Sequence, residues 1–294
     1  MTEDVSQRFV DFDQWSTKDA IEAMYEGQLK AIASIKPALD DIAHAADMAA
    51  KRLKKNGRLI YVGAGTSGRL AVQDGAELGP TFGWPAERVV FCMAGGMQAL
   101  TISAEGAEDS YEDGLQKLCE ENVGKDDVVI GVAASGTTPF TLGALHQASM
   151  QHALTIGIAN NPDAPVLTNV NHPILVQTGS EIIAGSTRMK AGTAQKAILN
   201  MLSTAIMTRL GRVYKGLMVD MIASNQKLEI RAVKMVCDLA KCSKDVASVS
   251  LEQANMNIKT AVLIAHGQSH TSSEHILLKE DGNLRRALEH INRD

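Results

Sequence analysis

The sequence predicts an α/β protein, with a mostly parallel β-sheet covered by helices on both faces and a small helical module after it. Three observations predict this class. Short apolar runs alternate with segments of helical periodicity over residues 58–179, as expected where helices connect parallel strands. From residue 186 almost to the end the periodicity is helical only. Aromatic residues make up 4% of the chain, which suits close-packed helices better than an all-β sandwich.

Each element is predicted from its periodicity and from the residues that bound it. The N-terminal segment is typical of a helical region that follows a cap at Ser16 or Thr17, breaks near Pro37 and stops at Gly57. Five apolar runs indicate strands, over residues 58–63, 88–94, 127–135, 153–160 and 173–179. The segments between the strands are expected to be helical, and they include one through Glu77, one over residues 97–122 and one that begins at Pro139.

The C-terminal part of the chain is predicted to be helical. Its expected helical segments are residues 186–211, 221–242, 243–254, 255–267 and 272–294. No repeat or low-complexity linker sets this tail apart, so we expect it to pack on the α/β body. We therefore expect an N-terminal helical segment (1–56) packed on a central domain (57–214), followed by a C-terminal helical module (215–294).

Composition and charge exclude several classes of protein. The net charge of −5 argues against a general nucleic-acid surface, which needs a basic excess. The four cysteines lack C-x-x-C spacing, so neither a zinc ribbon nor a disulfide framework is indicated. The acidic N-terminus does not resemble a secretory signal, and no run of 18 apolar residues predicts a membrane span. We expect a soluble, cytoplasmic protein that binds neither nucleic acid nor membrane.

A glycine-rich motif follows the first predicted strand. Gly63, Gly65 and Gly68 form the pattern G-x-G-x-x-G, which occurs in dinucleotide-binding proteins. That function also needs an acidic residue at the end of the next strand, about 20 residues on, to bind the ribose hydroxyls. The next strand here ends in FCMAGG, without an acid and too far along the chain. The motif therefore predicts a phosphate site of another kind.

Three loops rich in Gly, Ser and Thr predict that phosphate site. They read GAGTSG after the first strand, ASGTTP after the third strand and GSTRMKAGT before a long helix. Ligands of open parallel sheets bind at the carboxyl ends of the strands, and N–H groups at helix N-termini bind phosphate. Thr138 and Pro139 suit the N-cap and first positions of a helix. Capping alone could explain the hydroxyls of any one loop, but three such loops favour a ligand.

Four longer motifs reveal a family. They are GRLIYVGAGTSGRL with DGAELGPTFGWP, AEGAEDSYEDG, GSTRMKAGTAQKAILNMLST and LMVDMIASNQKLEIRAV. With them, the chain resembles the sugar isomerase (SIS) domain and, within that group, the N-acetylmuramic acid 6-phosphate etherases. The resemblance implies an SIS domain over residues 57–214 and cleavage of the D-lactyl ether of the sugar phosphate. Residues expected to hold the phosphate are Gly65, Ser67, Gly68, Ser135, Gly136 and Thr138.

The same resemblance implies two catalytic carboxylates and no cofactor or metal. The family motifs place them on Glu77, in DGAELGP, and on Glu108, in EGAEDS. Once the sugar ring opens, the C1 aldehyde acidifies the C2 proton, and lactate leaves from C3 before water adds back. Such a reaction needs a base and an acid, which two carboxyl groups with separated pKa values supply. We expect Glu108 to take the C2 proton and Glu77 to protonate the lactate, although the two roles could be exchanged.

Other charged residues have weaker predictions. Arg69, Ser186, Thr187, Arg188 and Lys190 are candidate substrate contacts, and ion pairs at the surface are the alternative for the cations. The run AHGQSHTSSEH contains three histidines, but Gly267 and the polar residues around it predict a turn, so no metal site is expected.

The distance between the expected phosphate loop and Glu77 suggests a dimer. If residues 67–77 form one helix, its rise of about 1.5 Å per residue sets Glu77 roughly 15 Å from Ser67 along the axis. The helix must then break near Gly75 and Gly79, or Glu77 must serve the other subunit of a homodimer with sites near the interface. Two other functions stay open from sequence: a phosphosugar isomerase, and a phosphosugar sensor without catalysis.

Overall fold

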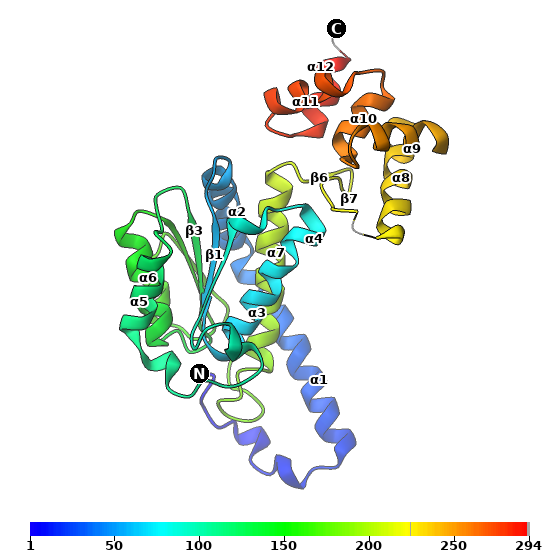
Figure 1. Ribbon diagram of the computed structural model, residues 1–294. Coiled ribbons are helices and arrows are strands. Elements are labelled where there is room, and N and C mark those ends of the chain that lie inside the picture. Colours follow the sequence, from blue (N-terminus) through cyan, green and yellow to red (C-terminus); the bar gives the residue numbers. More distant parts are fainter. Residues whose placement is uncertain (224, 293–294) are drawn as a thin grey trace. The chain divides into compact units, whose positions relative to one another are not determined.

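The computed structural model describes residues 1–223 and 225–292, and its centre is a five-stranded parallel sheet (Figure 1). The strand order is β2-β1-β3-β4-β5. The strands are β1 (Leu59–Gly63), β2 (Val89–Met93), β3 (Val128–Val132), β4 (Leu154–Ala159) and β5 (His172–Leu175). The predicted α/β class and all five predicted strands are confirmed. Ser224, Arg293 and Asp294, which belong to predicted helical segments, lie outside the described residues.

The chain divides into two compact units, which we describe one at a time. The first comprises residues 1–75 and 87–205, and the second comprises residues 76–86 and 206–294. The boundary near 206 falls nine residues before the expected start of the C-terminal module, and a short segment near residue 80 joins the second unit. Within the described residues, no helix is both long and apolar enough to cross a bilayer.

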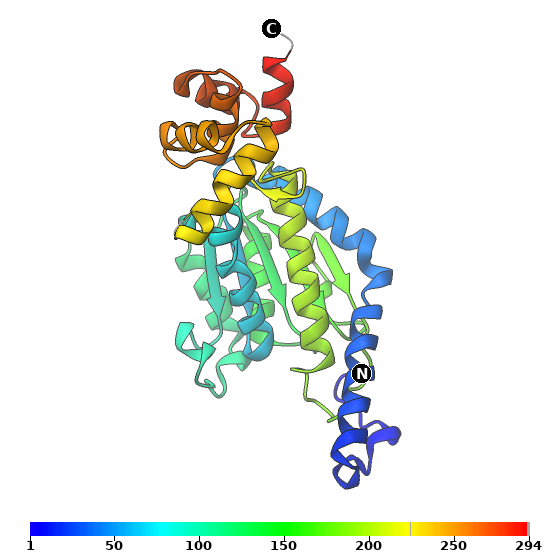
Figure 2. The same ribbon diagram turned by 90° about the vertical axis from the view of Figure 1, so that its right-hand side faces the viewer.

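Helices cover both faces of the sheet. The helices α5 (Tyr111–Glu120) and α6 (Pro139–Met150) lie on one face, and α2 (Leu39–Leu53), α3 (Gly65–Ala76) and α7 (Lys190–Arg209) lie on the other (Figures 1 and 2). Ile60 and Val62 pack toward α6, whereas the ring of Tyr61 lies beside Gly75 of α3. Because both faces are buried, the strands are continuous apolar runs rather than alternating ones.

The N-terminal segment forms the helical region that the sequence predicts. Ser16 caps α1 (Thr17–Ala33) by accepting a hydrogen bond from the Asp19 N–H, and a 3₁₀ turn at Lys36–Ala38 separates α1 from α2, as Pro37 predicts. The remaining 3₁₀ turns are η1 (Gln7–Phe9), η2 (Phe12–Gln14), η4 (Ala86–Arg88), η5 (Met97–Leu100), η6 (Ala107–Asp109) and η7 (Pro165–Leu167).

One predicted helix is wrong. Residues 97–122 do not form a single helix: η5 and η6 come first, and only α5 is α-helical. Gly96 and Gly106 have φ of 73° and 72°, a left-handed conformation that stops a helix from continuing. Ser110 then caps α5 by accepting from the Asp113 N–H. The segment before α5 is therefore a loop, and it carries Glu108.

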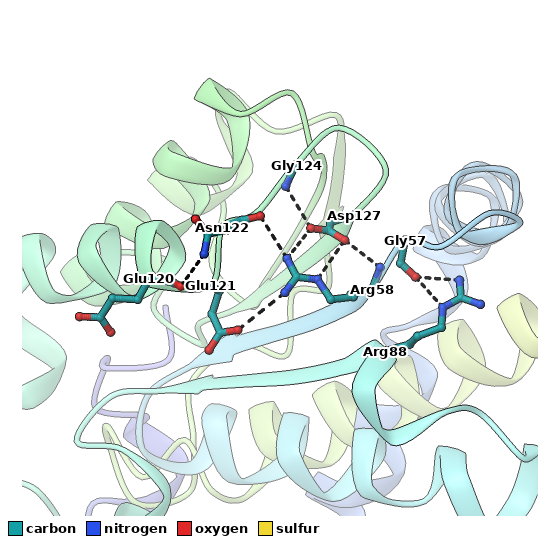
Figure 3. A network of polar contacts seen from close by, with 8 residues as sticks. All are labelled: Gly57, Arg58, Arg88, Glu120, Glu121, Asn122, Gly124 and Asp127. Atoms are coloured by element: carbon teal, nitrogen blue, oxygen red, sulfur yellow. Dashed lines mark hydrogen bonds and ion pairs between the residues drawn. The ribbon is translucent and has the colours of Figure 1, made fainter.

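A polar network closes the amino edge of the sheet (Figure 3). The Arg58 guanidinium donates to both carboxylate oxygens of Asp127, and the Arg58 and Gly124 N–H groups donate to it as well. Burial by itself raises the pKa of Asp127, but the hydrogen bonds from Arg58 and Gly124 outweigh it and hold that pKa below its ordinary value of 3.8. The Arg88 side chain donates to the Gly57 carbonyl. These hydrogen bonds tie together the loops at the amino ends of the strands. The glycine-rich loops that follow β1 and β3 lie at the opposite, carboxyl ends.

The second unit is helical apart from one short hairpin. Its helices are α4 (Leu78–Phe82), α8 (Gln226–Ala240), α9 (Lys244–Gln253), α10 (Ile258–Ala265), α11 (His270–Lys279) and α12 (Leu284–Ile291). The hairpin joins β6 (Val213–Tyr214) to β7 (Leu217–Met218) through Lys215 and Gly216, whose φ values are both positive, as a type I′ turn requires. Lys259, which is buried, and Asp220, which is partly buried, form an ion pair at 2.5 Å in this unit. The sequence analysis missed the hairpin.

Candidate active site at the carboxyl edge of the sheet

Two of the three glycine-rich loops follow the neighbouring strands β1 and β3, and the carboxyl ends of these strands lie side by side. β1 pairs with β3, and Gly63 is the register partner of Val132. The chain passes from β1 to its neighbour β2 and then crosses to β3, on the other side of β1. The strand order therefore reverses between β1 and β3. Ligands of open α/β sheets bind at such a point, at the carboxyl ends of the strands.

The first loop needs its glycines for close packing. A Cβ on Gly68 would lie 2.8 Å from the Gly63 carbonyl oxygen, and a Cβ on Gly63 would lie 2.9 Å from the Gly68 Cα. Gly65 has φ of +51°. The G-x-G-x-x-G pattern therefore sets how closely α3 approaches β1 and brings the N-terminus of α3 to the strand end.

A chain of buried polar side chains fixes Ser67. The Ser67 Oγ donates to Gln195 Oε1, the Gln195 Nε2 donates to Asn160 Oδ1, and the Asn160 Nδ2 donates to the Val176 carbonyl. A carbonyl oxygen only accepts, so Asn160 must turn its amide nitrogen toward Val176, and the direction of every other bond follows. The Ser67 hydroxyl therefore donates its one hydrogen bond to Gln195, and toward any other group its oxygen can only accept.

The second loop has one tightly packed residue and one hydroxyl that makes no cap. Gly136 has φ of +76°, and a Cβ there would lie 2.2 Å from the Ala164 Cβ. Ser135 Oγ accepts from the N–H and the hydroxyl of Thr137. Thr138 and Pro139 occupy the N-cap and first-turn positions of α6, as the sequence predicts, but the Thr138 side chain makes no capping hydrogen bond. Helix capping thus leaves the Thr138 hydroxyl unexplained.

The third loop is organised around a buried acid that sequence reasoning missed. The fully buried Glu181 carboxylate accepts from the N–H groups of Lys190 and Ala191, at 2.9 Å each. The Lys190 Nζ is also buried, it donates to the Thr178 carbonyl, and desolvation lowers its pKa. The N-terminus of α7 therefore already holds an anion of the chain itself. The candidate contacts Ser186, Thr187, Arg188 and Lys190 do not line the cavity described next.

A cavity of about 220 Å³ opens beside the first loop and brings three predicted site residues together. Gly65 is the first residue of α3, Arg69 lies in the second turn of the same helix, and Glu108 lies in η6. Glu108 is exposed, and its Oε2 lies 4.0 Å from the position that a Cβ would take on Gly65. Arg69 donates through Nε to the Ala99 and Leu100 carbonyls.

Glu77 lies in the other unit, between α3 and α4. Its carboxylate is exposed, and α3 runs unbroken from Gly65 through Gly75 to Ala76. At about 1.5 Å per residue, the helix between Ser67 and Ala76 is roughly 13 Å long. Asp74 of the same motif is buried and accepts from Tyr61 Oη and Ser203 Oγ, so it anchors α3 to the body.

Comparison with known proteins decides the family. A protein from Deinococcus radiodurans named N-acetylmuramic acid 6-phosphate etherase is 47% identical over 263 residues, which cover 90% of this chain and 86% of the relative. Proteins of the same name from Salmonella agona and Clostridium acetobutylicum are 43% and 41% identical over 282 and 288 residues, covering 96% and 98% of this chain and 95% of each relative. The chain belongs to the N-acetylmuramic acid 6-phosphate etherase family. The resemblance predicted from the motifs is confirmed.

Two SIS family models match overlapping parts of this chain. The model of the glucokinase regulatory protein N-terminal SIS domain matches residues 41–149, and the SIS domain model matches residues 102–205. A phosphoheptose isomerase from Francisella tularensis superposes with a TM-score of 0.51 at 20% identity, covering 66% of this chain and all of that one. A protein described as a phosphosugar isomerase from Bacteroides fragilis gives 0.52 at 18%, covering 68% and 95%. At these identities the structures show a common fold.

The histidine run forms the turn that the sequence predicts. α10 ends at Ala265 with His266 as its C-cap, Gly267 has φ of +92°, and His270 begins α11. His266 and His270 therefore do not share a helix, although their spacing is that of helical ligands. Residues 1–223 and 225–292 contain no group of three His, Cys, Asp or Glu side chains placed to hold a metal ion.

Proposed function

We infer that this protein is an N-acetylmuramic acid 6-phosphate etherase, a carbon–oxygen lyase that converts its substrate to N-acetylglucosamine 6-phosphate and D-lactate. The observation that carries the inference is the near-complete match to curated etherases at 41–47% identity. A cavity that places a carboxylate over the glycine loop supports it. The role that fits is the recycling of cell-wall amino sugars in the cytoplasm.

The proposed reaction is an elimination followed by a hydration. In the open-chain sugar, Glu108 takes the C2 proton, and the electron pair of the C2–H bond forms a C2=C3 double bond. The C3–O bond breaks, and D-lactate leaves with a proton from Glu77. Water then adds at C3, and a proton returns to C2. Every proton moves between substrate, water and carboxyl groups, so two carboxylates suffice.

The phosphate is proposed to bind where β1 and β3 end. N–H groups in the first turn of α3 have no partner within the helix, and they suit a dianion. The backbones of Gly65 and Gly136 and the Thr138 hydroxyl supply the remaining predicted contacts. The Gly68 N–H already donates to the Ala64 carbonyl, so Gly68 shapes the loop and does not offer its N–H to the phosphate. Ser67 and Ser135 stay predicted ligands. Ser67 would contribute its backbone N–H, while its hydroxyl continues to donate a hydrogen bond to Gln195.

We propose a homodimer in which Glu77 reaches the sugar held by the other subunit. The length of α3 supports a shared site. An apolar stripe on the outer face of α1 supports the assembly, because its side chains are half or more exposed: Ile21, Tyr25, Leu29 and Ile32. If two such helices pack antiparallel with Ile21 opposite Ile32, Glu22 comes opposite Ala31, next to Lys30, so opposite charges flank the apolar stripe of each helix.

The test is D-lactate release from purified protein and N-acetylmuramic acid 6-phosphate. Wild-type protein should release lactate, and both Glu77→Gln and Glu108→Gln should lower kcat by about 100- to 10,000-fold, the usual contribution of acid–base catalysis. Incorporation of solvent deuterium into a hexose phosphate without lactate would instead indicate an isomerase. A rise in melting temperature with phosphosugar that is never consumed would indicate a sensor.

A further inference from the structure

We propose that Arg69 binds the carboxylate of the substrate's D-lactyl group and so selects the ether substrate over sugar phosphates that lack it. The inference rests on the proposed function, since it names the side chain that recognises the leaving group.

The Arg69 guanidinium is held through its Nε atom, and its two terminal nitrogens are available to a ligand. Its Nε donates to the Ala99 and Leu100 carbonyls at 3.1 Å, which fixes the guanidinium plane against η5. Within residues 1–223 and 225–292, no hydrogen bond or ion pair is recorded for its Nη1 and Nη2 atoms, and Arg69 lines the cavity. A fixed guanidinium with two unpaired terminal nitrogens is suited to bidentate binding of a planar carboxylate.

The cavity needs a cation if an anion is to enter. The carboxyl groups of Glu105 and Glu108 line the same cavity, and Arg69 is the basic residue among its described lining residues. An incoming carboxylate is repelled by both acids, and Arg69 offsets that repulsion. An uncharged substituent would gain nothing from this side chain.

Position assigns the carboxylate rather than the phosphate to Arg69. The phosphate is proposed to bind where β1 and β3 end, whereas the walls of this cavity include Met93 and Ala94 at the end of β2, on the other side of β1. At about 220 Å³ the cavity is smaller than the roughly 300–1,000 Å³ of sites that enclose a whole drug-sized ligand. It suits a part of the substrate, and Glu108, the proposed base at C2, places that part next to C3.

The test compares two ligands that differ in the lactyl group. In a Glu108→Gln background, in which turnover is slowed by about 100- to 10,000-fold, calorimetry measures the affinities for N-acetylmuramic acid 6-phosphate and for N-acetylglucosamine 6-phosphate. Arg69→Met should weaken the first by about 10- to 100-fold, the value of a hydrogen-bonded charge, and change the second by less than about threefold. Arg69→Lys should give an intermediate loss, because an ammonium group does not form the bidentate pair.

Two outcomes would overturn the assignment. An equal loss for both ligands would make Arg69 a phosphate ligand or a purely structural residue, and no loss for either would remove it from recognition. Retained binding of N-acetylglucosamine 6-phosphate shows that the variant is folded, and Arg231→Met, an exposed site in α8, controls for the loss of one positive charge. If wild-type protein releases no lactate, the proposed function fails, but the ratio of the two affinities still decides the role of Arg69.

Discussion

At the scale of single residues, the site depends on which side chains have spare hydrogen-bonding capacity. The Ser67 hydroxyl donates its hydrogen bond to Gln195, and the N–H groups at the α7 N-terminus donate to Glu181. Among the residues that the structure describes, the terminal nitrogens of Arg69 have no partner, and the Thr138 hydroxyl makes no cap. The residues with unused donors are thus the ones that a negatively charged substrate needs.

Ser67→Ala should destabilise the protein even without substrate. The substitution leaves Gln195 Oε1, on a side chain that is 1% exposed, without its donor, and an unpaired buried acceptor costs about 1–3 kcal/mol. Chemical denaturation of the apo protein measures this loss. Ser135→Ala is the control, because Ser135 accepts only from exposed Thr137, so its loss should be smaller. Equal stability of Ser67→Ala and wild type would contradict the directional chain.

Asp127→Asn should remove a pH-dependent part of the stability. Folding lowers the pKa of Asp127, so the stabilisation is complete above its ordinary value of 3.8 and is lost as the pH falls through the lower folded-state value. At pH 7 the variant should lose about 1–3 kcal/mol of unfolding free energy, since the Arg58 guanidinium loses its nearer carboxylate and keeps only Glu121, at 3.8 Å, as an anionic partner. Urea denaturation between pH 7 and 3 should show the two proteins converging at the acid end. A constant difference would contradict this.

The motifs named most of the residues around the cavity, but not what holds them. Gly65, Arg69 and Glu108 lie together as their positions in the motifs suggested. Gln195 lies 128 residues from Ser67 in the chain, and Glu181 is one more acid in a loop, so nothing in the local pattern separates either from a solvated side chain. Their roles come from burial and long-range contact, which a single sequence does not encode locally.

At the scale of elements, the strands were predictable and one helix was not. Buried parallel strands are short runs of apolar residues, so their positions follow from hydropathy alone. Residues 97–122 carry helical periodicity in part, but Gly96 and Gly106 take left-handed conformations, and the chain forms turns until Ser110 caps α5. The competing property was backbone conformation, which overrode periodicity.

Gly136→Ala should show how tightly the second loop is built. The new Cβ would lie 2.2 Å from the Ala164 Cβ at a φ of +76°, so crowding adds to backbone strain, and we expect a loss of about 3 kcal/mol or more. Gly106→Ala is the matched control, with φ of +72°, a left-handed helical conformation and no atom within 4 Å of the added Cβ, and should lose only about 1–2 kcal/mol. Thermal denaturation of both variants measures the difference. Similar losses would show that strain alone matters.

At the scale of the whole molecule, the two predicted catalytic carboxylates belong to different compact units of the chain. Glu108 belongs to the unit that contains the sheet, and Glu77 belongs to the unit that contains the C-terminal helices. The domain boundaries expected from the sequence stay a prediction, because compact units do not by themselves define domains. The proposed dimer allows one subunit to supply Glu77 and the other Glu108.

Mixing two inactive variants should restore activity if the site is shared. Glu77→Gln and Glu108→Gln, unfolded together and refolded, form hybrid dimers in which one of two sites has both acids, so about one quarter of all sites should be active. D-lactate release measures the recovery, and each variant refolded alone is the control. No recovery in hybrid dimers would place both acids in one subunit.

The dimer itself can be broken at α1. Replacing Tyr25, which is 62% exposed, with Asp puts a charge into the apolar stripe and should give monomers in sedimentation experiments. Tyr25→Phe keeps the apolar surface and should stay dimeric. A wild-type protein that sediments as a monomer would contradict the proposed assembly.

The row of amides behind Ser67 has a further consequence. Since each amide fits in only one direction, a ligand that drew the Ser67 proton toward itself would leave Gln195 Oε1 without its donor and disturb the hydrogen bonds from Gln195 to Asn160. The side-chain NH₂ resonances of Gln195 and Asn160 are therefore built-in reporters of occupancy. Their NMR shifts would register a hydroxyl-bound phosphoryl group and stay unchanged if only backbone groups hold it.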